Sequence, residues 1–326
     1  MIFEKQILKA YRAMAYARCD GDDAVFYFSP EDFYGLEAKP ESFTASGGHT
    51  LSGYFYSYPA PIKNKLVIFD HGFGAGHRAY MKEIETLCRH GYTVFSYDHT
   101  GCVESGGENT NGMAQSLADL NDCLGFITSD KRFSDCDISV IGHSWGGFST
   151  MNIGALYPRV SRVVVISGFV SVQRLVSSFF SGIMKGYRRA VMAEERATNP
   201  VFSESDGIAS LSKFSGKALL IYSDDDKLCK RRDQFDPLAQ AFENNGRIRL
   251  RLVSGKGHNP NYTADAVRYK DAFFAELTKR RKRGLLKTDE QKREFIASYD
   301  WDRMTAQDKS VWEEIFSFLD EDGQNA

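Results

Sequence analysis

Six short apolar and β-branched runs, separated by longer amphipathic runs, constrain the fold of this chain most strongly. The strand-like runs are 65–70, 92–98, 137–142, 162–167, 217–223 and 248–254. Their nearly continuous apolar character is typical of strands buried on both faces. Helix-like runs lie between them near 79–90, 115–129, 145–156, 233–243 and 263–282. This alternation predicts an α/β fold with a mostly parallel, twisted sheet flanked by helices.

The alternation is interrupted once, between 162–167 and 217–223. Apolar residues in this interval recur at helical spacing, which predicts one helix over 171–195 with a wide apolar face. Parallel sheets carry their functional groups at the carboxyl ends of the strands, and the interval follows such an end. We therefore predict that about 168–216 forms a helical cap over the site, in preference to a helix that only packs on the core.

The segments outside this pattern are assigned separately. The stretch 43–58 reads as two short strands around a Gly-Gly turn and opens the main domain, which we place at 43–283. Residues 1–42 form an N-terminal extension, a short helix followed by irregular chain. Residues 284–326 form a C-terminal helical extension, whose amphipathic stretch 304–320 we expect to dock on the domain.

Charge and composition exclude several functional classes. The formal net charge is −2, with 42% hydrophobic and 26% charged residues, so no whole-protein field attracts nucleic acid or an anionic membrane. The sequence contains neither a membrane-length apolar run nor a signal-like h-region, and a cytoplasmic location is expected. The six cysteines are scattered and no His-Glu-x-x-His motif occurs, so neither a metal nor a cofactor is predicted. The oligomeric state is not predicted.

A serine surrounded by glycines is the strongest chemical signal. Gly142-His143-Ser144-Trp145-Gly146 follows a predicted strand and opens a predicted helix. The G-x-S-x-G elbow needs this context, because its glycines allow a sharp turn that exposes the serine. The helix N-terminus also favours negative charge developing beside that serine. Ser144 is therefore the candidate nucleophile.

Such a serine needs a base and an acid that orients the base. His258 follows the last predicted strand in a glycine-containing loop and can reach a serine on an interior strand. The stretch 222–229 follows the preceding strand and supplies the acid, for which we choose Asp226, with Asp225 as the alternative. His143 points away from its neighbour on the elbow, and His49, His90 and His99 are interpreted as ordinary surface or loop histidines.

The chain order of serine, acid and histidine is that of the α/β hydrolases. Over about 50–280 the sequence resembles the capped serine hydrolases of this fold, the group of esterases, monoacylglycerol lipases and serine aminopeptidases. The stretches 70–76, 97–107 and 157–167 resemble the family's loops around the oxyanion site and the sixth strand. The resemblance implies an oxyanion hole formed by the backbone N–H groups of Phe73 and Trp145, with His71 in a structural role. Ser223 and Val103 depart from the family pattern.

These residues predict a serine hydrolase that cleaves a carboxylic ester through an acyl-enzyme on Ser144, with a small-molecule acyl substrate. The apolar face of the cap suggests an apolar acyl or alcohol group. The residues predicted to contact it are Phe179, Phe180, Ile183 and Met184.

Alternative functions remain open at this point. The same triad suits a thioesterase or a serine aminopeptidase or amidase, and Glu194, Glu195, Glu204 and Asp206 could bind a free amino terminus. A hydrolase-fold protein that only binds a ligand is a further alternative. The stretch 65–77 also resembles a strand followed by a dinucleotide fingerprint, with Asp98 placed as a ribose-binding acid, although residue 77 is histidine in place of the third glycine.

Overall fold

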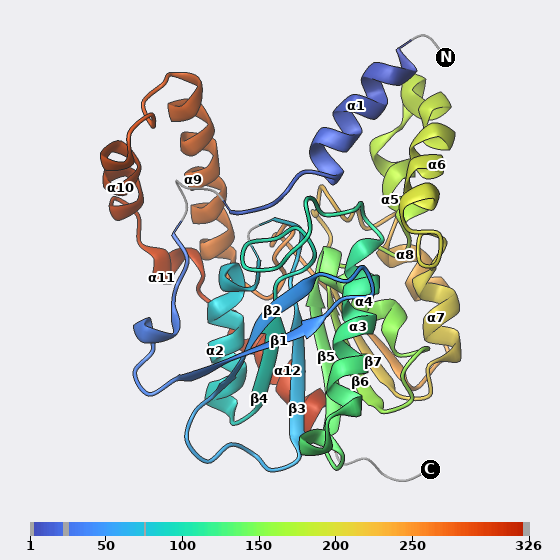
Figure 1. Ribbon diagram of the computed structural model, residues 1–326, viewed down its shortest axis with the longest axis vertical. Coiled ribbons are helices and arrows are strands. Elements are labelled where there is room, and N and C mark those ends of the chain that lie inside the picture. The colour runs from blue at the N-terminus through green and yellow to red at the C-terminus, as the bar shows by residue number, and fades with distance from the viewer. Residues whose placement is uncertain (1–2, 22–25, 75, 322–326) are drawn as a thin grey trace.

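A single eight-stranded sheet organises the protein. The computed structural model describes residues 3–21, 26–74 and 76–321. The strand order is β1-β2-β4-β3-β5-β6-β7-β8, and only β2 runs antiparallel to its neighbours (Figure 1). The strands are β1 (Glu37–Thr44), β2 (Thr50–Ser57), β3 (Lys65–Asp70), β4 (Thr93–Tyr97), β5 (Asp137–His143), β6 (Val160–Ile166), β7 (Lys217–Ser223) and β8 (Ile248–Val253). The predicted mostly parallel α/β sheet is confirmed.

Alternate residues of the central strands pack into two different cores. In β3, Leu66 and Ile68 contact the core on one face of the sheet, while Val67 and Phe69 contact the core on the other. Successive side chains of a strand point to opposite faces, so a strand buried on both faces must be apolar at every position. This requirement explains the continuous apolar runs in the sequence.

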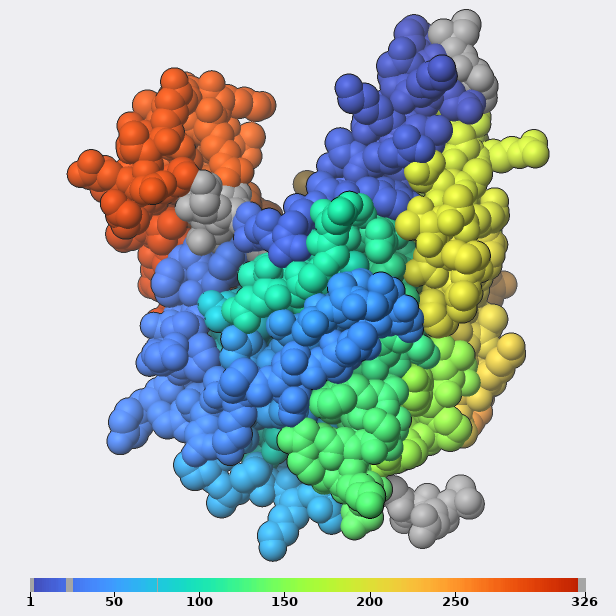
Figure 2. Space-filling view, in the orientation of Figure 1, coloured from blue at the N-terminus to red at the C-terminus, as the bar shows by residue number. Residues whose placement is uncertain are grey.

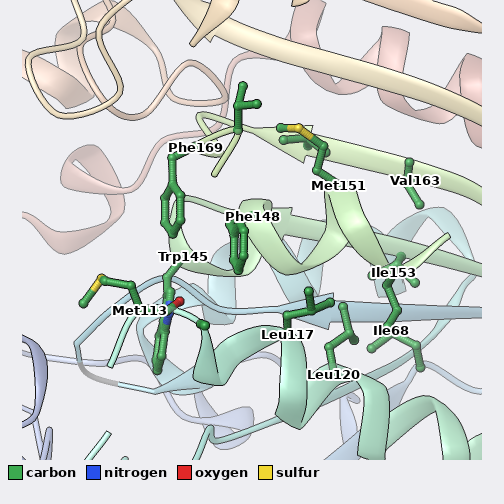
Figure 3. Packing of buried hydrophobic residues seen from close by; sticks show 14 of the residues in the cluster. Ile68, Met113, Leu117, Leu120, Trp145, Phe148, Met151, Ile153, Val163 and Phe169 are labelled. Carbon is green, nitrogen blue, oxygen red and sulfur yellow. The ribbon is translucent and has the colours of Figure 1, made fainter. Parts of the chain in front are cut away.

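The first core lies under α3 (Gln115–Ser129) and α4 (Trp145–Ile153). Figure 3 shows side chains of α4, among them Trp145 and Phe148, packed with Leu117 of α3. Every residue of α4 is buried. A helix enclosed on all sides has no polar face, which anchors its N-terminus firmly at the end of β5.

The second core lies under α2 (Met81–His90) and α12 (Lys309–Asp320). Ile84 of α2 and Trp312 and Ile315 of α12 are buried against the sheet. The predicted docking of the amphipathic stretch 304–320 is thereby confirmed for α12. The structure makes this helix a layer of the main domain, whereas the sequence-based boundary placed it in an extension beyond residue 283.

Between the last strand and α12 the chain builds a separate arm. Helices α9 (Ala264–Lys282), α10 (Asp289–Ala297) and α11 (Trp301–Met304) share a small core of Phe273, Leu277, Leu286, Phe295 and Met304. In Figure 1 this arm rises beside the sheet at the upper left. A domain boundary at residue 283 is therefore wrong, because it separates α9 from the helix packed on it.

The second arm contains the segment that was predicted to form a cap, and its helices differ from the prediction. The expected helix over 171–195 is two helices, α5 (Val172–Phe179) and α6 (Arg188–Thr198), joined by a 3₁₀ turn, Gly182–Tyr187; α7 (Gly207–Lys213) follows. Gly182 adopts φ 58°, a conformation that ends helical periodicity. The apolar spacing continued through this break, so the sequence did not reveal it.

The N-terminal helix belongs to the same arm. α1 (Glu4–Ala15) lies beside α6 in Figure 1, and Arg12 forms a bidentate ion pair with Glu194 at 2.7 Å. The Tyr11 hydroxyl donates a hydrogen bond to the buried Glu195 at 2.5 Å. Strand β1 also begins at Glu37, inside the segment predicted as an extension. Residues 1–42 therefore contribute to both the cap arm and the sheet. Within the described ranges, no helix is long and apolar enough to cross a bilayer.

Candidate active site

Ser144 occupies a strained turn between β5 and α4. Its backbone has φ 56° and ψ −108°, a conformation that non-glycine residues rarely adopt. A Cβ at Gly142 would lie 2.2 Å from the carbonyl oxygen of Gly146, and one at Gly146 would lie 2.0 Å from the carbonyl oxygen of Asp70. Both positions therefore exclude any side chain. The glycines around Ser144 permit the close approach of backbones that holds the half-buried serine at the cavity wall.

A histidine and a carboxylate complete a hydrogen-bonded line to this serine. His258 Nε2 lies 2.8 Å from Ser144 Oγ, and His258 Nδ1 lies 2.7 Å from Asp226 Oδ2. The second carboxylate oxygen of Asp226 accepts the backbone N–H groups of Leu228 and Cys229 at 2.8 and 3.0 Å. Asp226 is almost fully buried. The three residues, brought together from the ends of β5, β7 and β8, have the geometry of a nucleophile, its base and the acid that orients the base.

The two neighbouring aspartates hold the histidine loop. Asp225 Oδ1 accepts the Gly257 N–H at 2.8 Å, and the Ser223 hydroxyl donates to the same oxygen at 2.6 Å. Asp224 accepts hydrogen bonds from Ser254 and Gly255 in the same loop. Thus Asp226 contacts the histidine ring, whereas Asp225 contacts only the loop that carries it. Ser223, which departs from the family pattern, takes part in these contacts through its hydrogen bond to Asp225.

The two predicted oxyanion donors come from the elbow and from the loop after β3. Trp145 is the first residue of α4, where a backbone N–H has no partner one turn earlier in the helix. Phe73 lies in the loop after β3, beside Gly74, which adopts φ 129°. The rings of Phe73 and Trp145 meet edge to face with centroids 5.0 Å apart. The loop and the elbow are therefore in direct contact.

Two buried histidines, His71 and His99, are hydrogen-bonded within and beside the loop after β3 that carries Phe73. His71 Nδ1 donates to the Gly72 carbonyl at 2.7 Å, and its Nε2 accepts the His99 N–H at 3.0 Å. Burial lowers the pKa of His71 to about 3, so the ring is neutral and serves as a structural link.

His99 differs from the sequence-based interpretation as an ordinary surface or loop histidine. The His99 side chain is fully buried. Its Nδ1 lies 3.2 Å from a carboxylate oxygen of Asp119, and its Nε2 lies 3.1 Å from a carboxylate oxygen of Asp70. The contact with Asp70 is at ion-pair distance but lacks hydrogen-bond geometry. Burial alone would lower the pKa of His99, but the charge of Asp70 and the hydrogen bond to Asp119 raise it to about 10. His99 is therefore a buried imidazolium.

Tyr80 and His143 join the three catalytic loops, a connection that sequence reasoning missed. The Gly72 N–H donates to the Tyr80 hydroxyl at 3.1 Å, and this hydroxyl donates to His143 Nδ1 at 2.8 Å. His143 Nε2 donates to the carbonyl of His258 at 2.7 Å. Burial holds the pKa of His143 well below its usual value, which keeps the ring neutral and able to accept at Nδ1. No sequence spacing links Tyr80 to His143, because the contact depends on how the 3₁₀ turn His77–Tyr80, before α2, packs beside the end of β5.

A cavity of about 500 Å³ opens on Ser144 and His258. Its apolar wall comes from both arms and includes Met14 of α1, Leu175 and Phe179 of α5, and Phe274 of α9. Of the four predicted cap contacts, only Phe179 lines this cavity. Phe180 packs against the core, Ile183 is 96% exposed, and Met184 lies in the 3₁₀ turn, away from the wall. The broken helix accounts for this difference, because it turns these three side chains away from the serine.

The dinucleotide interpretation fails on the position of its acid. Asp98 is buried, and its carboxylate accepts hydrogen bonds from the ring and backbone of His77 and from the Glu104 N–H. These contacts occupy the carboxylate, so it cannot bind a ribose hydroxyl. His77 replaces the third glycine of the fingerprint and is the partner that holds Asp98 in place.

One group of potential metal ligands occurs among the described residues. Ligand atoms of Asp226, Cys229 and His258 lie within 4.8 Å of one another. His258 Nδ1 and Asp226 Oδ2 already face each other across a hydrogen bond, so these two atoms are engaged with each other. The arrangement fits proton transfer better than metal coordination.

Comparisons with known proteins find a matching family model and several similar folds. Residues 61–204 match the family described as serine aminopeptidase, S33. The esterase Pf2001 of Pyrococcus furiosus superposes with a TM-score of 0.58 at 20% identity, covering 83% of this chain and 98% of the esterase. The α/β hydrolase GrgF of Penicillium sp. sh18 has a TM-score of 0.50 at 18% identity, covering 80% and 99%. An acylaminoacyl peptidase of Pyrococcus horikoshii has a TM-score of 0.50 at 16% identity, covering 70% and 38%. At these identities the likeness establishes a shared fold.

Proposed function

We propose that this chain, which has the α/β hydrolase fold and matches the serine aminopeptidase S33 family over residues 61–204, cleaves a carboxylic ester through an acyl-enzyme on Ser144. The observation that carries the proposal is the unbroken line from Ser144 Oγ through His258 to Asp226, at 2.8 and 2.7 Å. A serine in this contact is activated by the adjacent base. The surrounding cavity, lined by apolar side chains, supports an apolar substrate.

The mechanism follows from the positions of these atoms. Ser144 Oγ attacks the ester carbonyl carbon while its proton passes to His258 Nε2, and Asp226 stabilises the resulting imidazolium. The C–O bond to the alcohol then breaks, and the alcohol leaves with the proton from His258. Water repeats the sequence: it gives a proton to His258, attacks the acyl carbon, and releases the acid as Ser144 regains its proton.

The proposed oxyanion donors contribute at both tetrahedral stages. The N–H groups of Phe73 and Trp145 would face the carbonyl oxygen as it gains negative charge. Each donor of this kind typically contributes about 2.7–4 kcal/mol to transition-state stabilisation. Because the α4 N-terminus is rigidly buried, the Trp145 donor needs no rearrangement during the reaction.

A serine aminopeptidase is the second candidate, favoured by the family description. Such an enzyme needs a negative group for the substrate's free amino terminus, but no carboxylate lines the catalytic cavity among the described residues. The one charged side chain that lines it is Lys270, which would repel an ammonium group. The four acids considered from the sequence all have other partners. Glu194 pairs with Arg12, and Glu195 accepts a hydrogen bond from Tyr11. Glu204 pairs with Arg196, and Asp206 caps the N-terminus of α7. Ester hydrolysis is therefore the first choice.

The proposal is tested by intact mass after exposure to a fluorophosphonate probe. The wild type should gain one adduct, Ser144→Ala should gain none, and Ser212→Ala, which changes an exposed serine of α7, should match the wild type. A positive result should be followed by a panel of neutral esters, thioesters and aminoacyl amides. Folded wild-type protein that forms no adduct would contradict the proposal and favour a hydrolase-fold protein that only binds its ligand.

A further inference from the structure

A second cavity, of about 530 Å³, adjoins the catalytic cavity. Its walls come from the N-terminal segment around Cys19 and Phe28, from α9, and from α11 with the adjoining Thr305. Figure 2 shows the molecule hollowed between the arm built by α9–α11 and the arm built by α1 and α6. The two cavities share six wall residues: Phe73, Ala79, Tyr80, Tyr262, Lys270 and Phe274. The two cavities are therefore two lobes of one site, and they join beside the loop after β3 that carries Phe73.

The second lobe is aromatic, and most of its charged side chains are paired. Rings of the N-terminal segment meet those of the C-terminal arm there, as Phe26 and Trp301 do with centroids 5.2 Å apart. Apart from Lys270 of the shared wall, its charged side chains form ion pairs, Arg18 with Asp20, Arg78 with Glu104, and Lys82 with Asp302. A wall of this kind favours an uncharged group that carries an aromatic ring.

The position of His258 indicates where the leaving alcohol departs. In the proposed mechanism the alcohol oxygen takes its proton from His258, so the alcohol must depart along the side occupied by the histidine loop. Three of the six shared wall residues, Tyr262, Lys270 and Phe274, follow His258 in the chain. Lys270 Nζ donates to Asn259 Oδ1 at 3.1 Å and lies 5.0 Å from the Tyr262 ring centroid, which ties this wall to the histidine loop.

We propose that the second lobe binds the alcohol part of the substrate, so that the protein prefers esters of bulky, uncharged, ring-bearing alcohols. The inference rests on the proposed ester hydrolysis at Ser144. The acyl part then occupies the lobe beneath the cap, lined by Leu175 and Phe179. One substrate thus spans both lobes, with its scissile bond at Ser144.

The test compares two series of esters. In the first, butanoate is joined to primary alcohols of similar acidity: ethanol, benzyl alcohol and 2-naphthylmethanol. In the second, ethanol is joined to acids of increasing chain length. We expect kcat/KM to rise about tenfold or more from the ethyl to the naphthylmethyl ester, the gain expected for burying an aromatic ring. A flat or falling alcohol series would overturn the inference.

Two variants of the second lobe test the assignment from opposite directions. Trp301→Ala removes part of its wall, and Thr305→Phe reduces its volume, so both should remove most of the alcohol dependence while the acyl dependence stays that of the wild type. Tyr34→Ala, which changes a fully exposed ring outside both cavities, is the control. Thermal unfolding identifies a variant that fails to fold. If the variants change the acyl series and leave the alcohol series intact, the two lobes are assigned the wrong way round.

The outcomes also separate this inference from the proposed function. Ser144-dependent cleavage of ethyl esters with no alcohol preference would contradict only the inference. Failure of every ester, together with no fluorophosphonate adduct, would contradict the proposed function itself.

Discussion

Asp225 Oδ1 accepts the backbone N–H of Gly257 at 2.8 Å, one residue before the catalytic candidate His258. Asp226, the next residue, instead contacts the histidine ring. Two adjacent carboxylates thus act on the same histidine, one through the backbone of its loop and the other through its Nδ1 atom. Their substitutions should therefore differ in kind as well as in size.

Replacing the two aspartates separately tests this division. Asp226→Asn should lower kcat by about 10⁴-fold, because an amide no longer fixes the histidine tautomer or stabilises its cation. Asp225→Asn should lower kcat by about tenfold or less, since the amide oxygen can still accept the Gly257 N–H. Steady-state kinetics on one ester measures both. A larger loss in the Asp225 variant would move the acid role to Asp225.

Tyr80 is expected to position the catalytic loops, because its hydroxyl joins the Gly72 N–H to His143. Tyr80→Phe leaves that N–H and His143 Nδ1 without this partner. Because one or two buried hydrogen bonds are lost, kcat should fall by about tenfold or more. His143→Phe, which removes the next link, should act in the same direction, and the double variant should be little worse than either single one. Additive losses would show that the two residues act independently. The rate of fluorophosphonate labelling should fall in parallel with kcat.

The buried imidazolium of His99 predicts a loss of stability in alkaline solution. Its pKa is about 10 in the folded protein and about 6.5 in an unfolded chain, so the folded state binds the proton more tightly. The stabilisation is complete below about pH 6.5 and is lost as pH rises through the folded pKa of about 10. Urea unfolding of the wild type and His99→Gln at several pH values should show a stability difference that shrinks with rising pH. A difference that grows with pH would contradict a charged His99.

Lys270 is expected to select against positively charged substrates. It lines both lobes, and burial lowers the pKa of its ammonium group although the nearby carboxylate of Glu83 opposes the shift. Lys270→Glu should raise the kcat/KM ratio of an aminoacyl ester over its neutral isostere by about tenfold, the size of one charge reversal near a protein surface. Lys270→Gln, which keeps a donor for Asn259, should give a smaller change. An unaltered ratio in both variants would show that Lys270 does not face the substrate.

The sequence alone was sufficient for the sheet and for the candidate triad. Strands buried on both faces must be apolar throughout, so β3 and β7 carried their bounds in the sequence itself. The carboxyl ends of parallel strands meet at one edge of a sheet, so Ser144, Asp226 and His258 could be grouped before any contact was known.

Only the tertiary structure decided which groups beyond the triad face the serine. Phe179 ends α5 and lines the catalytic cavity, whereas Phe180, Ile183 and Met184 lie beyond the end of this helix and do not line it. The Tyr80–His143 contact and the imidazolium of His99 join segments far apart in the chain, so no local pattern encodes them. The same holds for the second lobe, which exists because α9–α11 fold back beside the N-terminal segment. Local propensity and strand topology determine where catalytic groups can lie, whereas pocket shape and buried charge depend on packing between distant segments.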